Sequence, residues 1–420
     1  MKILLKSAEI IDKNSPYNFQ KKNIVIVDGK IEKIGDFEET ADIVLESPNL
    51  KVSPGWFDLR ASIKDPGSEH KEDIHSATRA AASGGFTGIV CMPNTKPVLQ
   101  TKDLVEYISN RSANKITSVY PVAAVTLDNK GEEITEMIDL HKAGAIAFSD
   151  GNKPIWHSDV LLKTLQYLQA FDGLLLVHAE DKYVSIHGQM NEGVTSTLLG
   201  LKGLPKLAEE IIVERDLRIL RYTGGKIHFS HVSSPRSLQL IKEAKQEGLK
   251  VTADITAYNL ALDDTLLTSF DTNLKVNPPL RSKEDIDTFW EYLKEGVIDA
   301  IVSDHNPQDE ESKNLEFDLA EFGMIGLETV FPIINTIKRD LSLETLIDKI
   351  CFAPRRILGL PQPVIKEGEL AEITVFDSEY EWEFTQSDIK SKSKNTPFLG
   401  WKFKGKPLAV VNKGMYFINN

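Results

Sequence analysis

The sequence predicts an α/β fold, a (β/α)8 (TIM) barrel joined to a small β-sandwich built from both termini. Three observations support this prediction: the length of 420 residues, the alternation of strand-like and helical patterns through the middle, and the β character of both ends. A chain of this length exceeds one ordinary domain. We expect the two parts of the sandwich at residues 1–51 and 356–420, and the barrel at 52–355.

Both ends of the chain show short strand patterns separated by turns. In KNIVIVDGKIEKIG, two β-rich runs flank Asp28-Gly29, a dipeptide typical of a two-residue hairpin turn. Near the other end, GELAEITVFD alternates as a strand does, and further short β pieces follow Asn395. We therefore expect the two ends to form one β domain.

Strand-like runs alternate with helical patterns between the two ends. Eight strands with intervening helices fit a closed barrel. An open doubly wound sheet is the alternative, but it would normally carry a Gly-rich phosphate loop, and the sequence has neither GxGxxG nor a Walker A motif. The expected strands are 52–58, 86–92, 117–125, 144–148, 173–178, 226–231, 250–254 and 298–303. The expected helices are 71–83, ending at Gly84-Gly85, and 103–112, 132–142, 158–170, 205–222, 234–247 and 284–295.

Composition excludes several classes of function. Acidic residues outnumber basic ones by 62 to 49, for a net charge of −13, which argues against nucleic acid as the partner. The two cysteines form no CxxC and predict no disulfide framework. No apolar run approaches the ~20 residues of a membrane span, and the N-terminus lacks the features of a signal peptide. We expect a cytoplasmic protein.

Polar residues follow four of the predicted strands, where the chemistry of such barrels is placed. Asp150 follows the fourth strand, His178 ends the fifth, His231 ends the sixth and Asp304 ends the eighth. Imidazole and carboxylate are ligands that Zn²⁺ accepts. A single histidine there is also typical of a hydrogen-bonded packing residue, and a single aspartate of a helix cap. The spacing leaves both readings open.

One histidine of the sixth strand has a structural interpretation. His228 lies three residues before His231, so the two side chains face opposite sides of the strand. If His231 points into the barrel, we expect His228 to be buried against the helices.

The stretch VSPGWFDLRASIKDPGSEHKEDIHSATRAAASGGFTGIVCMPNTKPV resembles the first-strand block of dihydroorotases, cyclic amidohydrolases of pyrimidine biosynthesis. The family pattern there is PG-x-x-D-x-H-x-H-x-R-x-PG, followed by GG-x-T and MPNT. The resemblance continues through nearly the whole chain, in Phe148-Ser149-Asp150, His178-Ala179-Glu180, His231-Val232-Ser233, VNPPLR, Ser303-Asp304-His305, GMIGLET, APRRILGL and SKSKNTPFLGWKFKGK. It implies a barrel of the metal-dependent hydrolase type beside the small β-sandwich.

The resemblance also implies a set of site residues. Its metal ligands fall on Asp150, His178, His231 and Asp304, and Asp304 is the family's catalytic acid and base. Its substrate contacts fall on Lys64, Asn94, Asn277 and Gln308.

The chain departs from the family pattern at the first metal and at substrate capture. The two histidines of H-x-H are replaced by Arg60 and Ser62, which are unsuited to Zn²⁺. The family's substrate arginine is Lys64, and the last histidine of D-H-A-P-H is Gln308. The family's D-D-G is shortened to Asp150-Gly151. We expect Arg60 to pair with Asp304 in place of the missing cation.

These departures allow three functional hypotheses. The first is a noncatalytic homologue, binding no metal, that supports aspartate carbamoyltransferase, as such subunits do in some bacteria. The second is a hydrolase with one Zn at the second metal site, acting on dihydroorotate or another cyclic amide. The third is a two-metal enzyme with substitute ligands such as His305. In each case we expect a homo-oligomer that contacts neither nucleic acid nor membrane.

Overall fold

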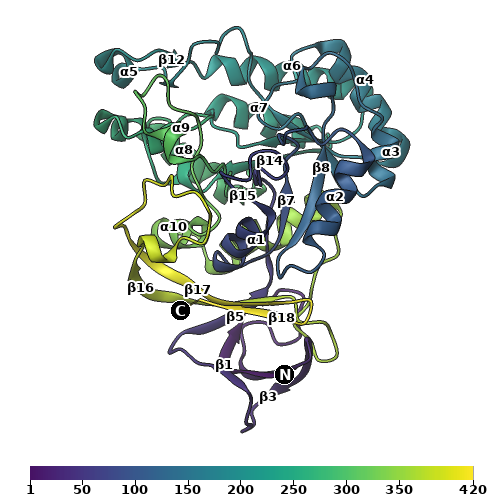
Figure 1. Cartoon of the computed structure of the whole chain (residues 1–420), viewed down its shortest axis with the longest axis vertical. Helices are drawn as coiled ribbons and strands as arrows, with labels where there is room; N and C mark the ends of the chain where they lie inside the picture. The colour runs from purple at the N-terminus through teal and green to yellow at the C-terminus, as the bar shows by residue number, and fades with distance from the viewer. Residues whose placement is uncertain (420) are drawn as a thin grey trace.

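The computed structural model describes residues 1–419 and contains two large β-sheets (Figure 1). One is the parallel sheet of the barrel, surrounded by helices. The other lies at one end of the molecule and contains strands from both ends of the chain. In the described part of the chain, no helix is long and apolar enough to cross a membrane.

The barrel sheet has eight parallel strands in the order β15-β14-β13-β10-β9-β8-β7-β6. Across the two end strands, the Ser303 N–H donates to Asp58 Oδ1 at 2.7 Å, and a parallel bridge joins Ala61 to His305. The predicted barrel is therefore confirmed. Its strands are β6 (Trp56–Asp58), β7 (Phe86–Cys91), β8 (Ser118–Ala123), β9 (Ala147–Phe148), β10 (Leu175–His178), β13 (Ile227–Ser230), β14 (Val251–Thr256) and β15 (Ala300–Val302).

Helices connect the barrel strands and bury one apolar face against them. In α4 (Ser158–Leu168) the apolar residues at helical spacing, including Leu161 and Leu165, are all buried. The helix expected at 132–142 begins only at Met137, because Ile134 forms a bridge with Thr126 instead. The other helices are α1 (Ile74–Ser83), α2 (Lys102–Ser112), α3 (Met137–Lys142), α5 (Val194–Leu199), α6 (Leu207–Thr223), α7 (Pro235–Gln246), α8 (Lys283–Lys294), α9 (Glu310–Lys313), α10 (Val330–Ile337), α11 (Leu343–Ile347) and α12 (Ala353–Leu358).

The second sheet combines both ends of the chain in the order β18-β17-β16-β5-β1-β2-β3, with β4 paired to β1. Asp28 and Gly29 have φ of +47° and +80°, as the expected hairpin turn requires. Its strands are β1 (Lys2–Ile10), β2 (Lys21–Val27), β3 (Lys30–Gly35), β4 (Ile43–Leu45), β5 (Leu50–Pro54), β16 (Ile373–Glu383), β17 (Lys402–Asn412) and β18 (Met415–Ile418). A separate two-stranded sheet pairs β11 (Met190–Asn191) with β12 (Gly203–Leu204).

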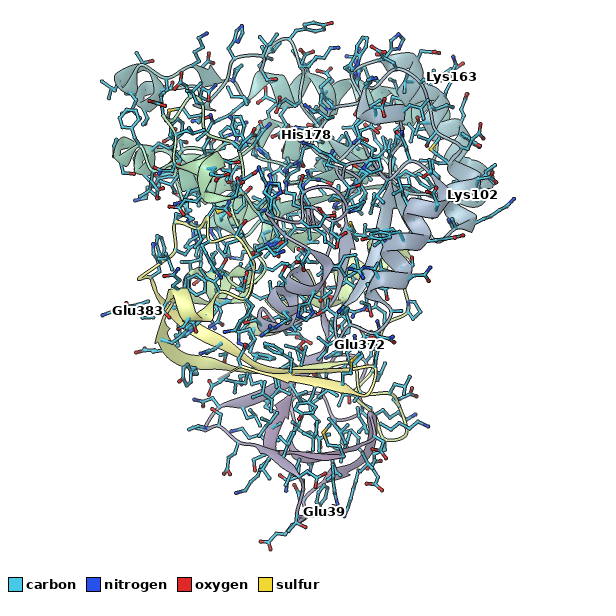
Figure 2. The ribbon with its side chains drawn as sticks, in the orientation of Figure 1. Glu39, Lys102, Lys163, His178, Glu372 and Glu383 are labelled. Carbon is cyan, nitrogen blue, oxygen red and sulfur yellow. The ribbon has the colours of Figure 1, made fainter. Side chains whose placement is uncertain are left out.

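The two large sheets meet at Gly55, which separates β5 from β6 within the single run expected at 52–58. A Cβ at Gly55 would lie 2.1 Å from Thr87 Oγ1, so only glycine fits. Buried Arg355 donates to the Gly55 carbonyl at 2.6 Å and to the carboxylate of Glu372. Figure 2 shows Glu372 at this junction. The junction fixes the barrel to the terminal sheet.

Candidate functional site

The predicted site residues gather at the carboxyl ends of the barrel strands. Arg60 and Ser62 follow β6, Asp150 follows β9, His231 follows β13, and Asp304 follows β15. All five are buried. His231 and Asp304 have φ of +43° and +45°, left-handed conformations that redirect the chain just after its strand. The fold therefore brings these side chains into one buried layer.

Arg60 and Asp304 form an ion pair in this layer. Arg60 Nε donates to Asp304 Oδ1 at 2.8 Å, and the Tyr258 hydroxyl donates to Oδ2 at 2.7 Å. The Arg60 side chain is 2% exposed. Burial raises the pKa of Asp304, while the guanidinium and the tyrosine hydroxyl oppose that rise. Both oxygens of the expected catalytic carboxylate are thus occupied by protein donors.

The two histidines of the expected metal site contact each other. His178 Nδ1 lies 3.0 Å from His231 Nε2, within hydrogen-bonding distance. His178 Nε2 lies 3.3 Å from Glu180 Oε2, and His231 Nδ1 lies 3.9 Å from Asp304 Oδ2. Burial lowers the pKa of His231 well below its ordinary value, and the charge of Arg60 adds to this. The contact between the two rings thus engages one nitrogen of each imidazole, His178 Nδ1 and His231 Nε2.

The Asp150 carboxylate accepts hydrogen bonds from the loop after β8. Its Oδ1 accepts from the backbone N–H groups of Val125 and Thr126 at 3.0 and 2.8 Å, and its Oδ2 accepts from the Thr126 hydroxyl. Burial raises the pKa of Asp150 to about 6. The carboxylate therefore caps the loop after β8, and a ligand role for Asp150 stays a prediction.

The other histidines near the barrel have structural partners. His228 is buried, and its Nε2 lies 2.7 Å from Asp254 Oδ2. His305 Nε2 lies 3.3 Å from Glu72 Oε2, and its Nδ1 accepts from the Gly326 N–H. His228 is thus a core residue, as expected. His305 uses both nitrogens outside the metal position, which argues against it as a substitute ligand.

The donor set does not fit a metal centre well. Within residues 1–419, no group of three or more His, Cys, Asp or Glu side chains is arranged to hold a metal ion. The Arg60 guanidinium instead pairs with Asp304, the carboxylate that the resemblance assigns to a metal. The imidazoles of His178 and His231 lie within hydrogen-bonding distance of each other. The side chains as they are arranged therefore do not support a catalytic step through a metal.

The four expected substrate contacts do line one cavity. It has a volume of about 740 Å³ and also includes His178 in its wall. Lys64 Nζ donates to Asn306 Oδ1, Asn277 donates to Glu180, and Gln308 accepts from Lys71. Figure 2 shows His178 at the centre of the barrel end opposite the terminal sheet. The lining residues taken from the sequence are Lys64, Asn94, Asn277 and Gln308.

Sequence reasoning missed two residues that contact the Arg60–Asp304 pair. Tyr258 follows β14, which runs two residues further than expected, so its hydroxyl reaches Asp304. Asn152 accepts a hydrogen bond from Arg60 Nη2. A search for polar residues a few positions beyond each strand, rather than directly after it, would have found both.

Comparison with known proteins gives a consistent result. Residues 50–237 match the family model described as Dihydro-orotase-like. A protein named dihydroorotase from Ruminiclostridium cellulolyticum is 41% identical, over 99% of this chain and 98% of its own. Another, from Pelotomaculum thermopropionicum, is 40% identical over 99% of this chain and 98% of its own.

Solved structures share the fold at low sequence identity. The L-hydantoinase (dihydropyrimidinase) of Arthrobacter aurescens superposes with a TM-score of 0.85 at 23% identity, covering 99% of this chain and 96% of the other. A D-hydantoinase superposes with a TM-score of 0.83 at 22% identity, covering 100% and 95%. At such identities the likeness shows the fold alone.

Proposed function

Because the chain belongs to the dihydroorotase family, we propose that it serves pyrimidine biosynthesis as a member that has lost metal-dependent hydrolysis. In this proposal the chain, itself a homo-oligomer, acts as a structural partner of aspartate carbamoyltransferase. The proposed partner rests on the resemblance to noncatalytic subunits. The proposed loss of hydrolysis rests on the side chains at the barrel mouth.

The observation that carries the loss of hydrolysis is the pairing of Arg60 with Asp304. A divalent ion about 4 Å from a guanidinium would be repelled by about 8 kcal/mol at an effective dielectric constant of about 20. Each oxygen of Asp304 also already accepts a hydrogen bond from a protein donor, so neither oxygen is free to take a proton from a water. The guanidinium therefore disfavours both metal binding and the proton transfer that hydrolysis needs.

A second candidate is a hydrolase that would hold one Zn with Asp150, His178 and His231 and would use Asp304 as its general base. One observation favours it: His231 Nδ1 is buried, has no hydrogen-bond partner and lies 3.9 Å from Asp304. A bound zinc would supply Lewis-acid chemistry and an activated water. Dihydroorotate or another cyclic amide would be its substrate.

One experiment separates these candidates. The purified chain is assayed for interconversion of dihydroorotate and carbamoyl-aspartate with excess Zn²⁺, alone and with aspartate carbamoyltransferase from the same host. We expect no interconversion in either case. We also expect the two proteins to co-purify as a defined complex.

The controls decide what a positive result means. Turnover that disappears in His178→Ala would establish the one-metal hydrolase and contradict the loss of activity. Turnover that survives in His178→Ala would indicate a contaminating enzyme. If the chain purifies from its host without aspartate carbamoyltransferase, the structural partnership is wrong.

A further inference from the structure

A cavity of about 510 Å³ lies beside the terminal sheet, away from the barrel mouth. Its wall comes from α1, from the loop between α2 and β8, and from the turn and strand at β18. Figure 1 shows α1 above β18, at the end of the barrel that faces the terminal sheet. Within residues 1–419, no residue lines both this cavity and the one that contains His178. We call it the α1–β18 cavity.

Hydrogen bonds fix the wall of the α1–β18 cavity. The Thr117 hydroxyl donates to the Thr78 carbonyl at 3.0 Å, which ties the loop before β8 to α1. Asn412 Nδ2 donates to the Ile116 carbonyl at 2.7 Å, which ties the β17–β18 hairpin to the same loop. The cavity is therefore preformed, as small-molecule sites usually are.

The ionised side chains that line this cavity are basic, although the chain as a whole has a net charge of −13. Arg79 and Lys115 line it, and among the described residues no aspartate or glutamate does. The N-terminal ammonium of Met1 also lies there, but it is paired with Asp28 at 2.7 Å. Two cationic side chains thus face the cavity without an acidic residue in its wall.

Arg79 and Lys115 also lack acidic partners elsewhere. Throughout the part of the chain that the structure describes, no carboxylate forms an ion pair with either side chain. Lys115 Nζ lies 3.4 Å from His75 Nδ1, a neighbour that brings no negative charge. His75 and Arg79 are one turn apart on α1, so they share a face of the helix. An anion that entered the cavity would supply the missing counter-charge.

Lys115 also lines a second, smaller hollow, whose wall contains carboxylates. These carboxylates have other partners. Asp73 pairs with Lys392, and the oxygens of Asp65 and Glu69 accept hydrogen bonds from neighbouring groups. The Lys115 ammonium therefore remains available to a ligand of the α1–β18 cavity.

An aromatic ring and apolar side chains lie in the same wall as these charges. Tyr416 lines the cavity and is 44% exposed, and Met415 and Ile116 lie beside it in the wall. An exposed aromatic ring offers a stacking surface to a flat ring of a ligand, and a methionine thioether makes favourable contacts with such rings. The cavity thus combines a surface for a flat ring with two charges for an anion.

We propose that the α1–β18 cavity binds a small molecule that carries both a flat ring and a phosphate monoester group. Such a phosphate carries about −1.5 to −2 charges at pH 7, which matches Arg79 and Lys115 together, whereas a carboxylate would leave one of them unpaired. The planar fork of Arg79 can hold two phosphate oxygens, and Lys115 adds a compact charge. The volume lies within the range of small-molecule sites, roughly 300–1,000 Å³.

This site is independent of the proposed function, because its lining residues do not belong to the barrel mouth. The test titrates the full-length chain by calorimetry with adenosine monophosphate, with adenosine and with inorganic phosphate. We expect saturable binding of the monophosphate, and binding at least about tenfold weaker for each of the other two probes, which carry only the ring or only the phosphate. If the monophosphate does not saturate, or if either fragment binds as tightly, the proposal is wrong.

Two double variants test the location of the site. Arg79→Gln/Lys115→Gln removes both charges of the cavity, and we expect binding of the monophosphate to weaken by about tenfold or more. Lys163→Gln/Arg218→Gln is the matched control, because it removes one lysine and one arginine charge from exposed pairs on α4 and α6, and we expect no change. An equal loss in both variants would show non-specific attraction and overturn the proposal. Thermal unfolding of each variant checks that it is folded.

Variants of Tyr416 test the contact with the ring. We expect Tyr416→Ala to weaken binding of the monophosphate and to leave the weak binding of inorganic phosphate unchanged, because the phosphate alone needs no stacking surface. Tyr416→Phe keeps an aromatic ring and should bind the monophosphate like the unaltered chain. Unchanged affinity of Tyr416→Ala for the monophosphate would overturn the proposal.

Discussion

Arg60 is the residue that distinguishes this barrel mouth most clearly from that of a metal-dependent hydrolase. It is nearly fully buried and is paired with a carboxylate that the resemblance assigns to a metal. A buried ion pair of this kind gains little net stability over apolar side chains, but breaking one leaves a buried charge alone. Removing Arg60 alone should therefore destabilise the folded protein.

We expect Arg60→Ala to lower the free energy of unfolding by about 3 to 5 kcal/mol, because it leaves Asp304 buried without its counter-charge. Urea denaturation measures the loss. The double variant Arg60→Ala/Asp304→Ala should lose far less than the sum of the two single variants. Fully additive losses would mean that the two side chains do not act as a pair.

For single residues, the sequence predicts which of them lie together at the barrel mouth but not where each side chain points. His178, His231 and Asp304 each follow a strand, and the barrel brings them together. Asp150 also follows a strand, yet its carboxylate turns to two backbone N–H groups of the neighbouring loop. That choice depends on the local path of the loop after β8, which has no signature in strand periodicity.

Helix α1 shows how one element joins distant parts of the chain. Asp73 caps its N-terminus by accepting from the Ser76 N–H at 2.8 Å, and it also pairs with Lys392 from the C-terminal segment. Burial acts to raise the pKa of Asp73, but the hydrogen bonds from Lys392 and Ser76 outweigh it and lower the pKa to about 2.

The variant Asp73→Ala should therefore destabilise the protein in a pH-dependent way. We expect a loss of about 1 kcal/mol at pH 7. The lowered folded pKa means that this contribution is fully present above the unfolded value of 3.8 and is lost as the pH falls towards 2. Urea midpoints between pH 7 and pH 3 measure it. The variant Asp73→Asn keeps an oxygen that can cap the helix but removes the charge. It therefore separates the contribution of the cap from that of the ion pair with Lys392. A loss that grows at acidic pH would contradict this assignment.

The sequence predicted the existence of the barrel strands better than it predicted where each strand begins and ends. The eight strands appear where apolar runs predicted them, but the run at 144–148 yields only β9, Ala147–Phe148. The run at 52–58 divides at Gly55, because the chain passes there from one sheet to the other. Periodicity predicts that a strand exists, whereas its pairing partners decide where it begins and ends.

The whole molecule depends on the junction between its two sheets. Trp56 packs there against Phe331 and Phe376, with ring centres 4.7 and 5.4 Å apart. Arg355 donates across the same junction to the Gly55 carbonyl and to Glu372. The barrel and the terminal sheet should therefore unfold together.

We expect Arg355→Ala to lower the free energy of unfolding by about 3 kcal/mol and to split a single calorimetric transition into two. The adjacent Arg356→Ala is a matched control, because Arg356 is half exposed and pairs with Asp348 at the surface. It should have little effect. Equal effects of the two variants would mean that the junction does not depend on Arg355.

The terminal sheet also constrains how the protein can be made. Strand β5 pairs with β16, so that Val52 lies opposite Val375, 323 residues later in the chain. During synthesis the first strands leave the ribosome long before their partner exists, and they must wait with an open edge. The barrel, whose strands pair mostly with neighbours in sequence, can form in the meantime. The terminal sheet would then close last, and the nascent N-terminal strands would be the segment most dependent on chaperones.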